Sequence, residues 1–288
     1  MLELSHYAFV ASLVAVAGAF LLYVAWTIAA RSTRGMELAG GGTVSAPADA
    51  GNAASLGRYA TILVVNAFVF LTLSLALRSV ESGHGPFSNM YEFSLAFSWG
   101  ALVIYLYFEV KYHLRSLGLL VMPVTLGMLA YATTVPDRID PLVPALQNNL
   151  LLTIHVATAV IAYGAFAFGF ASAVLYIVQK DNRFRWLPRR SVLDEMGYRS
   201  VIVGFPMMAL VIILGAVWAQ IAWGTYWSWD PKETASLVTW LLYGGYLHAR
   251  VIRGWRGDRS AALLILGFGA TMFTYYGNLF FSGLHSYG

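Results

Sequence analysis

The chain has 288 residues, of which 59% are hydrophobic and only 11% are Asp, Glu, Lys or Arg. A soluble domain carries roughly 25% charged residues, so a water-soluble globular fold is excluded, and the mean hydropathy of +0.65 indicates a polytopic membrane protein. The chain contains no cysteine. Disulfides, thiol nucleophiles and cysteine-held metal sites are therefore excluded within it.

Eight apolar runs approach or exceed the roughly 20 residues that a helix needs to cross a bilayer. They cover residues 6–30, 59–79, 91–109, 116–135, 149–178, 200–221, 234–252 and 260–283. Backbone groups in lipid must be hydrogen-bonded within the segment, and none of the runs shows the alternation of barrel strands. The sequence predicts an all-α polytopic membrane protein with about eight transmembrane helices.

The basic residues are distributed unevenly between the two sets of connections. Of the 18 Lys and Arg residues, all but Arg78, Arg138 and Lys232 fall on one side of an eight-span topology. Because Lys and Arg are retained on the cytoplasmic side, both termini are predicted to lie outside the cytoplasm. The basic clusters are short juxtamembrane loops, which argues against a nucleic-acid partner.

Between the first two runs lies a segment rich in small residues. Gly35 to Ser55 reads G-M-E-L-A-G-G-G-T-V-S-A-P-A-D-A-G-N-A-A-S, which is typical of a flexible linker. The sequence therefore predicts that residues 1–58 form the first transmembrane helix with a cytoplasmic linker, and that residues 59–288 form one membrane domain.

An aromatic segment connects the sixth and seventh runs on the predicted outer side. It reads W-G-T-Y-W-S-W-D-P-K-E, from Trp223 to Glu233, and is called the Trp loop below. One interpretation is an interfacial aromatic belt, and Asp230, Pro231 and Glu233 also match the start of a helix with its N-cap, N1 and N3 residues. A second interpretation is a flat aromatic shelf beside Lys232 for a planar ligand with carboxylates, such as a porphyrin.

Three of the six histidines are candidates for iron ligation. His155 lies six residues into the fifth run, and His285 follows the eighth, so both are expected near the Trp loop. His248 follows Pro231 by 17 residues and lies roughly 26 Å deeper along its helix. Two axial imidazoles are only about 4 Å apart, so one haem cannot use both levels. The spacing predicts an outer station with two histidines and an inner station with one.

These segments resemble a known family. The Trp loop and the following T-A-S-L-V-T-W-L-L-Y-G-G-Y-L-H-A-R are similar to the WWD signature of haem-handling proteins, within the CcsA/ResC branch of the System II cytochrome c maturation machinery. G-H-G-P-F-S-N-M-Y-E, Gly83 to Glu92, resembles a second motif of that branch, and the resemblance covers most of residues 60–288.

The resemblance implies that haem b crosses the membrane and is attached to apocytochrome c at the outer face. It makes His155 and His285 the outer axial pair and His248 the transmembrane ligand. It also implies a CcsB/ResB-type subunit that supplies the missing inner ligand, a thioredoxin-like reductant for the apocytochrome thiols, and synthase activity only within that complex. The expected haem-binding residues in the loop are Trp223, Gly224, Tyr226, Trp227, Trp229, Asp230 and Lys232.

Two alternatives remain open from the sequence. A System I protein of the CcmC type also carries a WWD segment, although it is typically shorter and differs after the aspartate, where this chain reads P-K-E-T-A-S. A CcmF-type relative is too long to match. From another class, the chain is compatible with a membrane transporter or a quinone-type redox subunit that has an aromatic interfacial loop.

Overall fold

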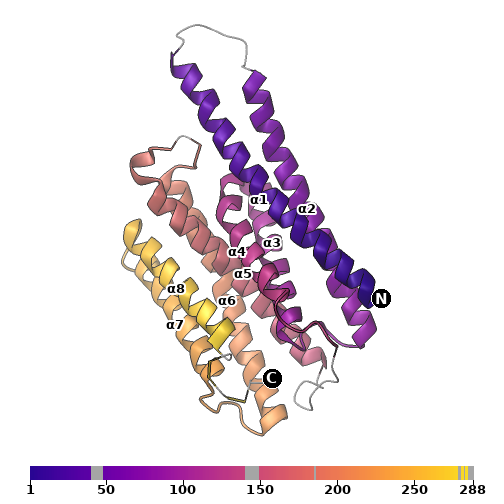
Figure 1. Ribbon diagram of the computed structural model, residues 1–288. Coiled ribbons are helices and arrows are strands. Elements are labelled where there is room, and N and C mark those ends of the chain that lie inside the picture. The colour runs from indigo at the N-terminus through magenta and orange to yellow at the C-terminus, as the bar shows by residue number, and fades with distance from the viewer. Residues whose placement is uncertain (40–47, 140–148, 185, 278–279, 282, 285–288) are drawn as a thin grey trace.

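The computed structural model describes residues 1–39, 48–139, 149–184, 186–277, 280–281 and 283–284. Within them the chain is all-helical and runs antiparallel from helix to helix (Figure 1). The α helices are α1 (Leu2–Ala39), α2 (Ala48–Ser82), α3 (Met90–Tyr112), α4 (Gly118–Ala132), α5 (Asn149–Val178), α6 (Arg190–Trp223), α7 (Pro231–Val251) and α8 (Asp258–Tyr276). Two short 3-10 turns, η1 (Arg115–Leu117) and η3 (Lys180–Asn182), precede α4 and follow α5.

The eight predicted helices are confirmed, and six of them are long and apolar enough to cross a membrane. These six spans lie in α1, α2, α3, η1–α4, α5 and α6. Helices α7 and α8 have 21 and 19 residues. Charged residues lower their hydropathy: Lys232, Glu233 and Arg250 in α7, and Asp258 and Arg259 in α8.

Several predicted boundaries differ from the structure. Helix α1 extends to Ala39 and α2 begins at Ala48, so both helices continue into the predicted linker, because its alanines together with Met36, Glu37 and Leu38 favour helix. Residues 40–47 of that linker lie outside the described residues. Helix α8 ends at Tyr276 instead of 283, where Gly277 follows.

Helix α5 occupies the centre of the bundle, with α3, α6 and α8 packed against it. Figure 1 shows α1 and α2 at one edge and α7 and α8 at the opposite edge. The contact between α3 and α5 requires glycine, because a Cβ on Gly164 would lie 2.5 Å from the carbonyl oxygen of Gly100. Small residues of this kind let two membrane helices bring their backbones together.

Contacts between loops define one end of the bundle, called the Trp end because it carries the Trp loop. The amino group of Met1 lies 3.8 Å from Glu81 at the end of α2, and Lys232 Nζ lies 5.6 Å from the ring centroid of Phe93 at the start of α3. The Leu284 backbone reaches Asp230 of the Trp loop. The two ends of the described chain therefore lie at the same end of the bundle, while the side of the membrane that this end faces stays a prediction.

A buried carboxylate joins four elements at the opposite end. Glu109 of α3, 4% exposed, accepts hydrogen bonds from Tyr23 Oη at 3.0 Å, from Thr61 Oγ1, and from Arg115 Nε at 3.3 Å. These partners come from α1, α2 and η1. Because a buried charge is stable only with such partners, Glu109 fixes the first four helices relative to one another.

Candidate functional site

The Trp loop begins where a left-handed glycine ends α6. Gly224 has φ +77°, and its N–H bonds to Gln220 O, which is the usual way for glycine to terminate a helix. Trp229 also has a positive φ, +60°, a conformation that costs energy for a residue with a side chain. The loop is therefore held in a specific conformation between two helix ends.

Tryptophans of the loop form two edge-to-face pairs, one of them with Trp218 of α6, and not the flat shelf of the second interpretation of the sequence. The rings of Trp218 and Trp223 are 4.6 Å apart with a 73° interplanar angle, and those of Trp227 and Trp229 are 5.7 Å apart at 89°. Aromatic quadrupoles favour this geometry over face-to-face contact. Trp229 is 69% and Tyr226 is 60% exposed, so the loop presents aromatic surface outward.

The predicted start of α7 is confirmed as a capping box. The Asp230 carboxylate accepts from Lys232 N at 2.9 Å, and Glu233 Oε2 accepts from Asp230 N at 3.2 Å. Glu233 Oε2 also accepts from Ser228 N at 2.9 Å. The acidic residues of the motif thus fix both the helix start and the preceding loop.

Asp230 has a second contact that the sequence did not predict. Its Oδ2 accepts a hydrogen bond from Leu284 N at 2.6 Å, and a Cβ on Gly283 would lie closer to Oδ2 than any real contact allows. The chain after α8 is therefore attached to the Trp loop one residue before His285. His285 itself lies outside the described residues, so its pairing with His155 stays a prediction.

The His155 ring lies against α6. A Cβ added at Gly215 would be 2.9 Å from His155 Cε1 and 3.4 Å from Nδ1. Gly215 precedes Gly224 by nine residues, or about 13 Å along the helix. The half-buried His155 side chain thus lies below the Trp loop. It lies against α6 at Gly215, three residues before Trp218.

The remaining predicted residues have contrasting environments. Lys232 is half-buried, with its ammonium group over the Phe93 ring, a cation–π contact. His248 is on α7, three residues before its end, and its side chain is exposed. In the described part of the chain, no hydrogen bond to the His248 ring is found. His248 is far along α7 from the Trp loop, as the sequence predicted.

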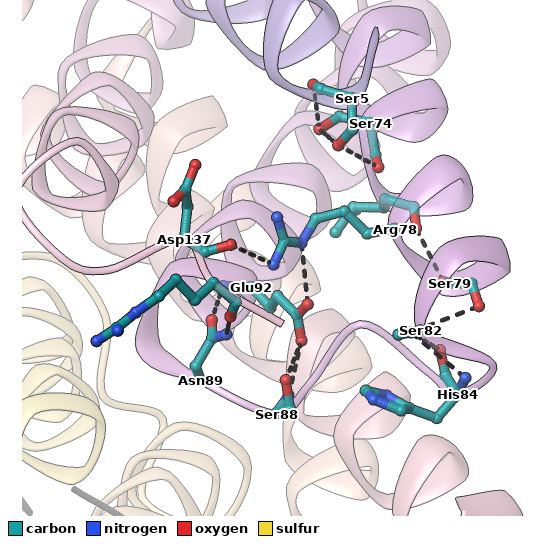
Figure 2. Close-up of polar contacts among 12 residues, drawn as sticks. Ser5, Ser74, Arg78, Ser79, Ser82, His84, Ser88, Asn89, Glu92 and Asp137 are labelled. Atoms are coloured by element: carbon teal, nitrogen blue, oxygen red, sulfur yellow. Dashed lines mark hydrogen bonds and ion pairs between the residues drawn. The ribbon is translucent and has the colours of Figure 1, made fainter. Parts of the chain in front are cut away.

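The Gly83–Glu92 segment is anchored by a buried ion pair. Arg78 and Glu92 are 3% and 0% exposed, with Nε and Oε1 2.9 Å apart, and Glu92 also accepts from Ser88 N and Oγ at 2.8 and 2.7 Å. Arg78 donates its other hydrogen bond to Asp137 O at 2.9 Å. Figure 2 shows Arg78 between Glu92 and the 137–138 segment.

This anchored segment contacts the helix that carries His155. A Cβ on Gly85 would lie 2.6 Å from Thr153 Oγ1, two residues before His155. The neighbouring His84 Nδ1 lies 2.8 Å from Gly85 O, so a neutral ring there carries its proton on Nδ1 and leaves Nε2 as the acceptor. Sequence reasoning assigned no role to Arg78; its position inside an apolar run was the available signal.

One buried group of the Trp loop, the indole N–H of Trp227, is compatible with a bound haem. Trp227 Nε1 is buried and has no hydrogen-bond partner among the described residues, although buried indole N–H groups normally have one. A propionate carboxylate is a suitable acceptor for it. Among the described residues, no group of three or more His, Cys, Asp or Glu residues is suited to a metal ion.

Comparisons with known proteins agree on one family. Residues 87–285 match the model of the cytochrome c assembly protein family. The cytochrome c biogenesis protein CcsA of Guillardia theta is 40% identical over 261 residues, which cover 81% of this chain and 85% of that protein. CcsA of Synechococcus elongatus is 36% identical over 268 residues, covering 74% and 82%.

A solved structure shares the fold. The chain named cytochrome c haem lyase CcmF aligns with a TM-score of 0.62 at 19% identity, over 96% of this chain and 46% of that one. The present chain thus spans about half the length of that protein, and at this identity the likeness concerns the fold alone. The family match and the identity to the CcsA proteins show that the chain belongs to the CcsA family of cytochrome c biogenesis proteins.

Proposed function

We propose that this protein acts in cytochrome c maturation by moving haem b across the cytoplasmic membrane and presenting it to apocytochrome c. The outer iron ligands are His155 and His285, and Trp223, Trp227 and Trp229 contact the porphyrin. Gly224, Tyr226, Asp230 and Lys232 shape the same site. In this proposal the Trp end and both termini face away from the cytoplasm, and residues 59–288 form the haem-handling domain.

The observation that carries this proposal is the hydrogen bond from Leu284 N to Asp230 Oδ2. It attaches the residue before His285 to the Trp loop. The close contact of His155 with Gly215 supports the same interpretation, because it fixes the other candidate ligand against α6, which leads directly into the loop. The unpartnered Trp227 Nε1 supports a role for the loop in holding a propionate.

The chemistry assigned to this site needs little from the protein beyond orientation. The apocytochrome thiols add across the vinyl groups of reduced haem, and the thiols belong to the acceptor, so the lack of cysteine in this chain is consistent. Two neutral imidazoles stabilise low-spin iron and retain it during transfer. We include a thioredoxin-like protein that keeps the acceptor thiols reduced.

The inner station is assigned to His248 together with a CcsB/ResB-type subunit. His248 shares an exposed face of α7 with Val238, Leu241 and Gly245, which recur at helical spacing. An imidazole on such a face, with Gly245 one turn away, is accessible to a flat ligand or a neighbouring helix. The second iron ligand would come from that partner, and synthase activity would require the complex.

The test is maturation of a reporter cytochrome c in cells that lack their own maturation system and co-express the partner subunit. His155→Gly should abolish covalent haem attachment, and added imidazole should partly restore it by filling the vacated ligand position. His113→Gly is the matched control, because His113 is exposed and has φ +55°, where glycine is favoured. Full maturation by His155→Gly without imidazole would contradict the ligand assignment.

Absorbance distinguishes a haem-handling protein from a membrane transporter that binds no haem. The purified complex should show a Soret band that is reduced when His155 is replaced and lost when His248 is replaced. A protein from haem-replete cells without any Soret band would favour a transporter with an aromatic loop. A System I role of the CcmC type would instead require maturation by this chain without a CcsB/ResB-type partner.

A further inference from the structure

The turn between α7 and α8 borders an open, shallow hollow of about 490 Å³ at the end of the bundle opposite the Trp loop. Its lining contains three arginines and one tryptophan: Arg253, Gly254, Trp255, Arg256, Asp258 and Arg259. We call this hollow the arginine pocket. Polar groups make up most of its wall, which distinguishes it from the apolar grooves between the helices.

The three arginines of the pocket have no carboxylate within ion-pair distance among the described residues. The acidic groups nearby are already paired, since Asp258 lies 2.5 Å from Arg190 and Asp194 lies 2.9 Å from Arg250. Arg190 and Arg250 are thereby neutralised, while Arg253, Arg256 and Arg259 are exposed. The pocket therefore carries an excess of positive charge on one small surface.

The turn is held rigidly, so these arginines start from fixed backbone positions. Trp255 N donates to Ala249 O at 3.0 Å, and Gly257 N donates to Asp194 Oδ1 at 3.1 Å. Ser260 Oγ donates to Trp255 O at 3.0 Å, and the Arg259 guanidinium lies 5.3 Å from the Trp255 ring centroid. A cluster of guanidinium groups suits a tetrahedral oxyanion, because each planar fork donates two parallel hydrogen bonds.

Apolar surface continues from the arginine pocket along the helices. Val251 and Ile252 are 61% and 71% exposed, and Ala262 and Leu266, one turn apart on α8, are exposed as well. Trp255, in the turn between these two groups, is a residue type typical of the membrane–water interface. A ligand that satisfies both features has an anionic head and a hydrocarbon tail.

We propose that the arginine pocket binds the phosphate of an anionic phospholipid, with an acyl chain along Val251, Ile252 and Leu266. In the eight-span topology predicted from the sequence, the α7–α8 turn lies where two transmembrane helices end, which is the depth of a lipid phosphate. A soluble phosphate compound has the same head chemistry but makes no use of the exposed apolar residues. The site is separate from the Trp loop, whereas Val251 and Ile252 lie within one helical turn of His248.

The test compares two lipids and two triple variants of the full-length protein. The protein is delipidated in detergent and titrated with dioleoylphosphatidylglycerol or dioleoylphosphatidylcholine, and bound lipid is counted by native mass spectrometry. The pocket variant carries Arg253→Gln, Arg256→Gln and Arg259→Gln. The control variant carries Lys180→Gln, Arg183→Gln and Arg189→Gln, which removes the same charge from exposed positions at the same end of the bundle.

The unmodified protein and the control variant should bind phosphatidylglycerol more tightly than phosphatidylcholine. The pocket variant should bind phosphatidylglycerol on the order of 100-fold more weakly, at roughly five-fold per arginine near an anionic headgroup. If the triple variant fails to fold, the single variant Arg256→Gln should show the roughly five-fold loss. Retained selectivity in the pocket variants, or an equal loss in the control variant, would overturn the proposal.

A further arm distinguishes the lipid from a soluble phosphate. Inorganic phosphate and glycerol 3-phosphate, added at millimolar concentration, should not displace bound phosphatidylglycerol, because they lack the tail. Displacement by either compound at micromolar concentration would assign the pocket to a soluble phosphate and overturn the lipid assignment.

Discussion

Asp230 connects the Trp loop to the end of the chain through Leu284. One carboxylate oxygen caps α7 at Lys232 N, 2.9 Å away, and the other accepts from Leu284 N at 2.6 Å. A single side chain thus sets where α7 starts and where the segment after α8 lies. The two contacts use different oxygens, so they can be separated by substitution.

Asp230→Asn should separate capping from attachment of the C-terminal segment. Asparagine caps helices as well as aspartate does, but its amide nitrogen cannot accept the Leu284 N–H. For Asp230→Asn we expect a stability loss below about 1 kcal/mol. Cytochrome c maturation should fall as strongly as in Asp230→Ala. Asp230→Ala should in addition lose the helix cap, at a cost of about 1 kcal/mol. Thermal unfolding in detergent and haem staining of the reporter cytochrome measure the two effects.

Ser236→Ala provides the control in the same helix. Among the described residues its hydroxyl bonds only to Lys232 O in the preceding turn, at 2.8 Å, so neither stability nor maturation should change measurably. If Asp230→Asn matured the cytochrome at the normal level, the contact with Leu284 would be irrelevant to function.

Gly215→Ala should disturb the outer site without removing a ligand. The new methyl group would lie 2.9 Å from His155 Cε1, so the imidazole must move. We expect a destabilisation of about 1–3 kcal/mol and a shifted Soret band in the purified complex. Gly127→Ala is the control, since nothing lies within 4 Å of its added Cβ, and helix stability there should rise by about 0.4–1 kcal/mol. Identical spectra in the two variants would contradict the role of Gly215.

The Arg78–Glu92 pair should contribute far more to stability than a surface pair. Both side chains are buried, so Arg78→Met or Glu92→Gln leaves an uncompensated or unsatisfied group and should cost about 3–5 kcal/mol. Arg199 and Glu195 are 44% and 42% exposed, and Arg199→Gln should cost less than about 1 kcal/mol. Chemical denaturation of the purified variants measures the two losses of stability. Equal losses would show that burial does not determine how much an ion pair contributes to stability.

Much of the fold could be predicted because membrane constraints are strong. Long apolar runs predict helices, and the Asp230-Pro231 start of α7 follows from capping chemistry, so both predictions were confirmed. The linker was predicted too long because glycines and alanines were read as coil, whereas an Ala-rich stretch next to a helix tends to extend it.

The candidate site was less accessible to sequence reasoning. A count of tryptophans indicates aromatic surface but not ring orientation, and the two edge-to-face pairs do not form a flat shelf. The contact between Asp230 and Leu284 joins residues 54 positions apart and leaves no local pattern. The Arg78–Glu92 pair likewise depends on tertiary packing, although its charges inside apolar runs were visible.

The predicted membrane orientation can be tested by reporter fusions. The excess of Lys and Arg at one end predicts that this end lies in the cytoplasm. Alkaline phosphatase fused after Gly288 should be active, and the same enzyme inserted between residues 40 and 47 should be inactive. A fluorescent protein that requires the cytoplasm should give the reverse pattern, and equal activity at both positions would contradict an eight-span topology.

His248→Ala tests whether the inner histidine has a ligand role or a structural one. A structural role would need a hydrogen bond between helices, yet the side chain is exposed on α7 with no such bond among the described residues. Its removal should therefore change stability by less than about 0.5 kcal/mol. If His248 binds haem on entry, the complex purified from cells should lose haem from both stations, because the outer one is loaded through the inner one. Leu241→Ala, on the same exposed face, serves as control and should retain haem. Normal outer-station haem in His248→Ala would show that haem enters by another route.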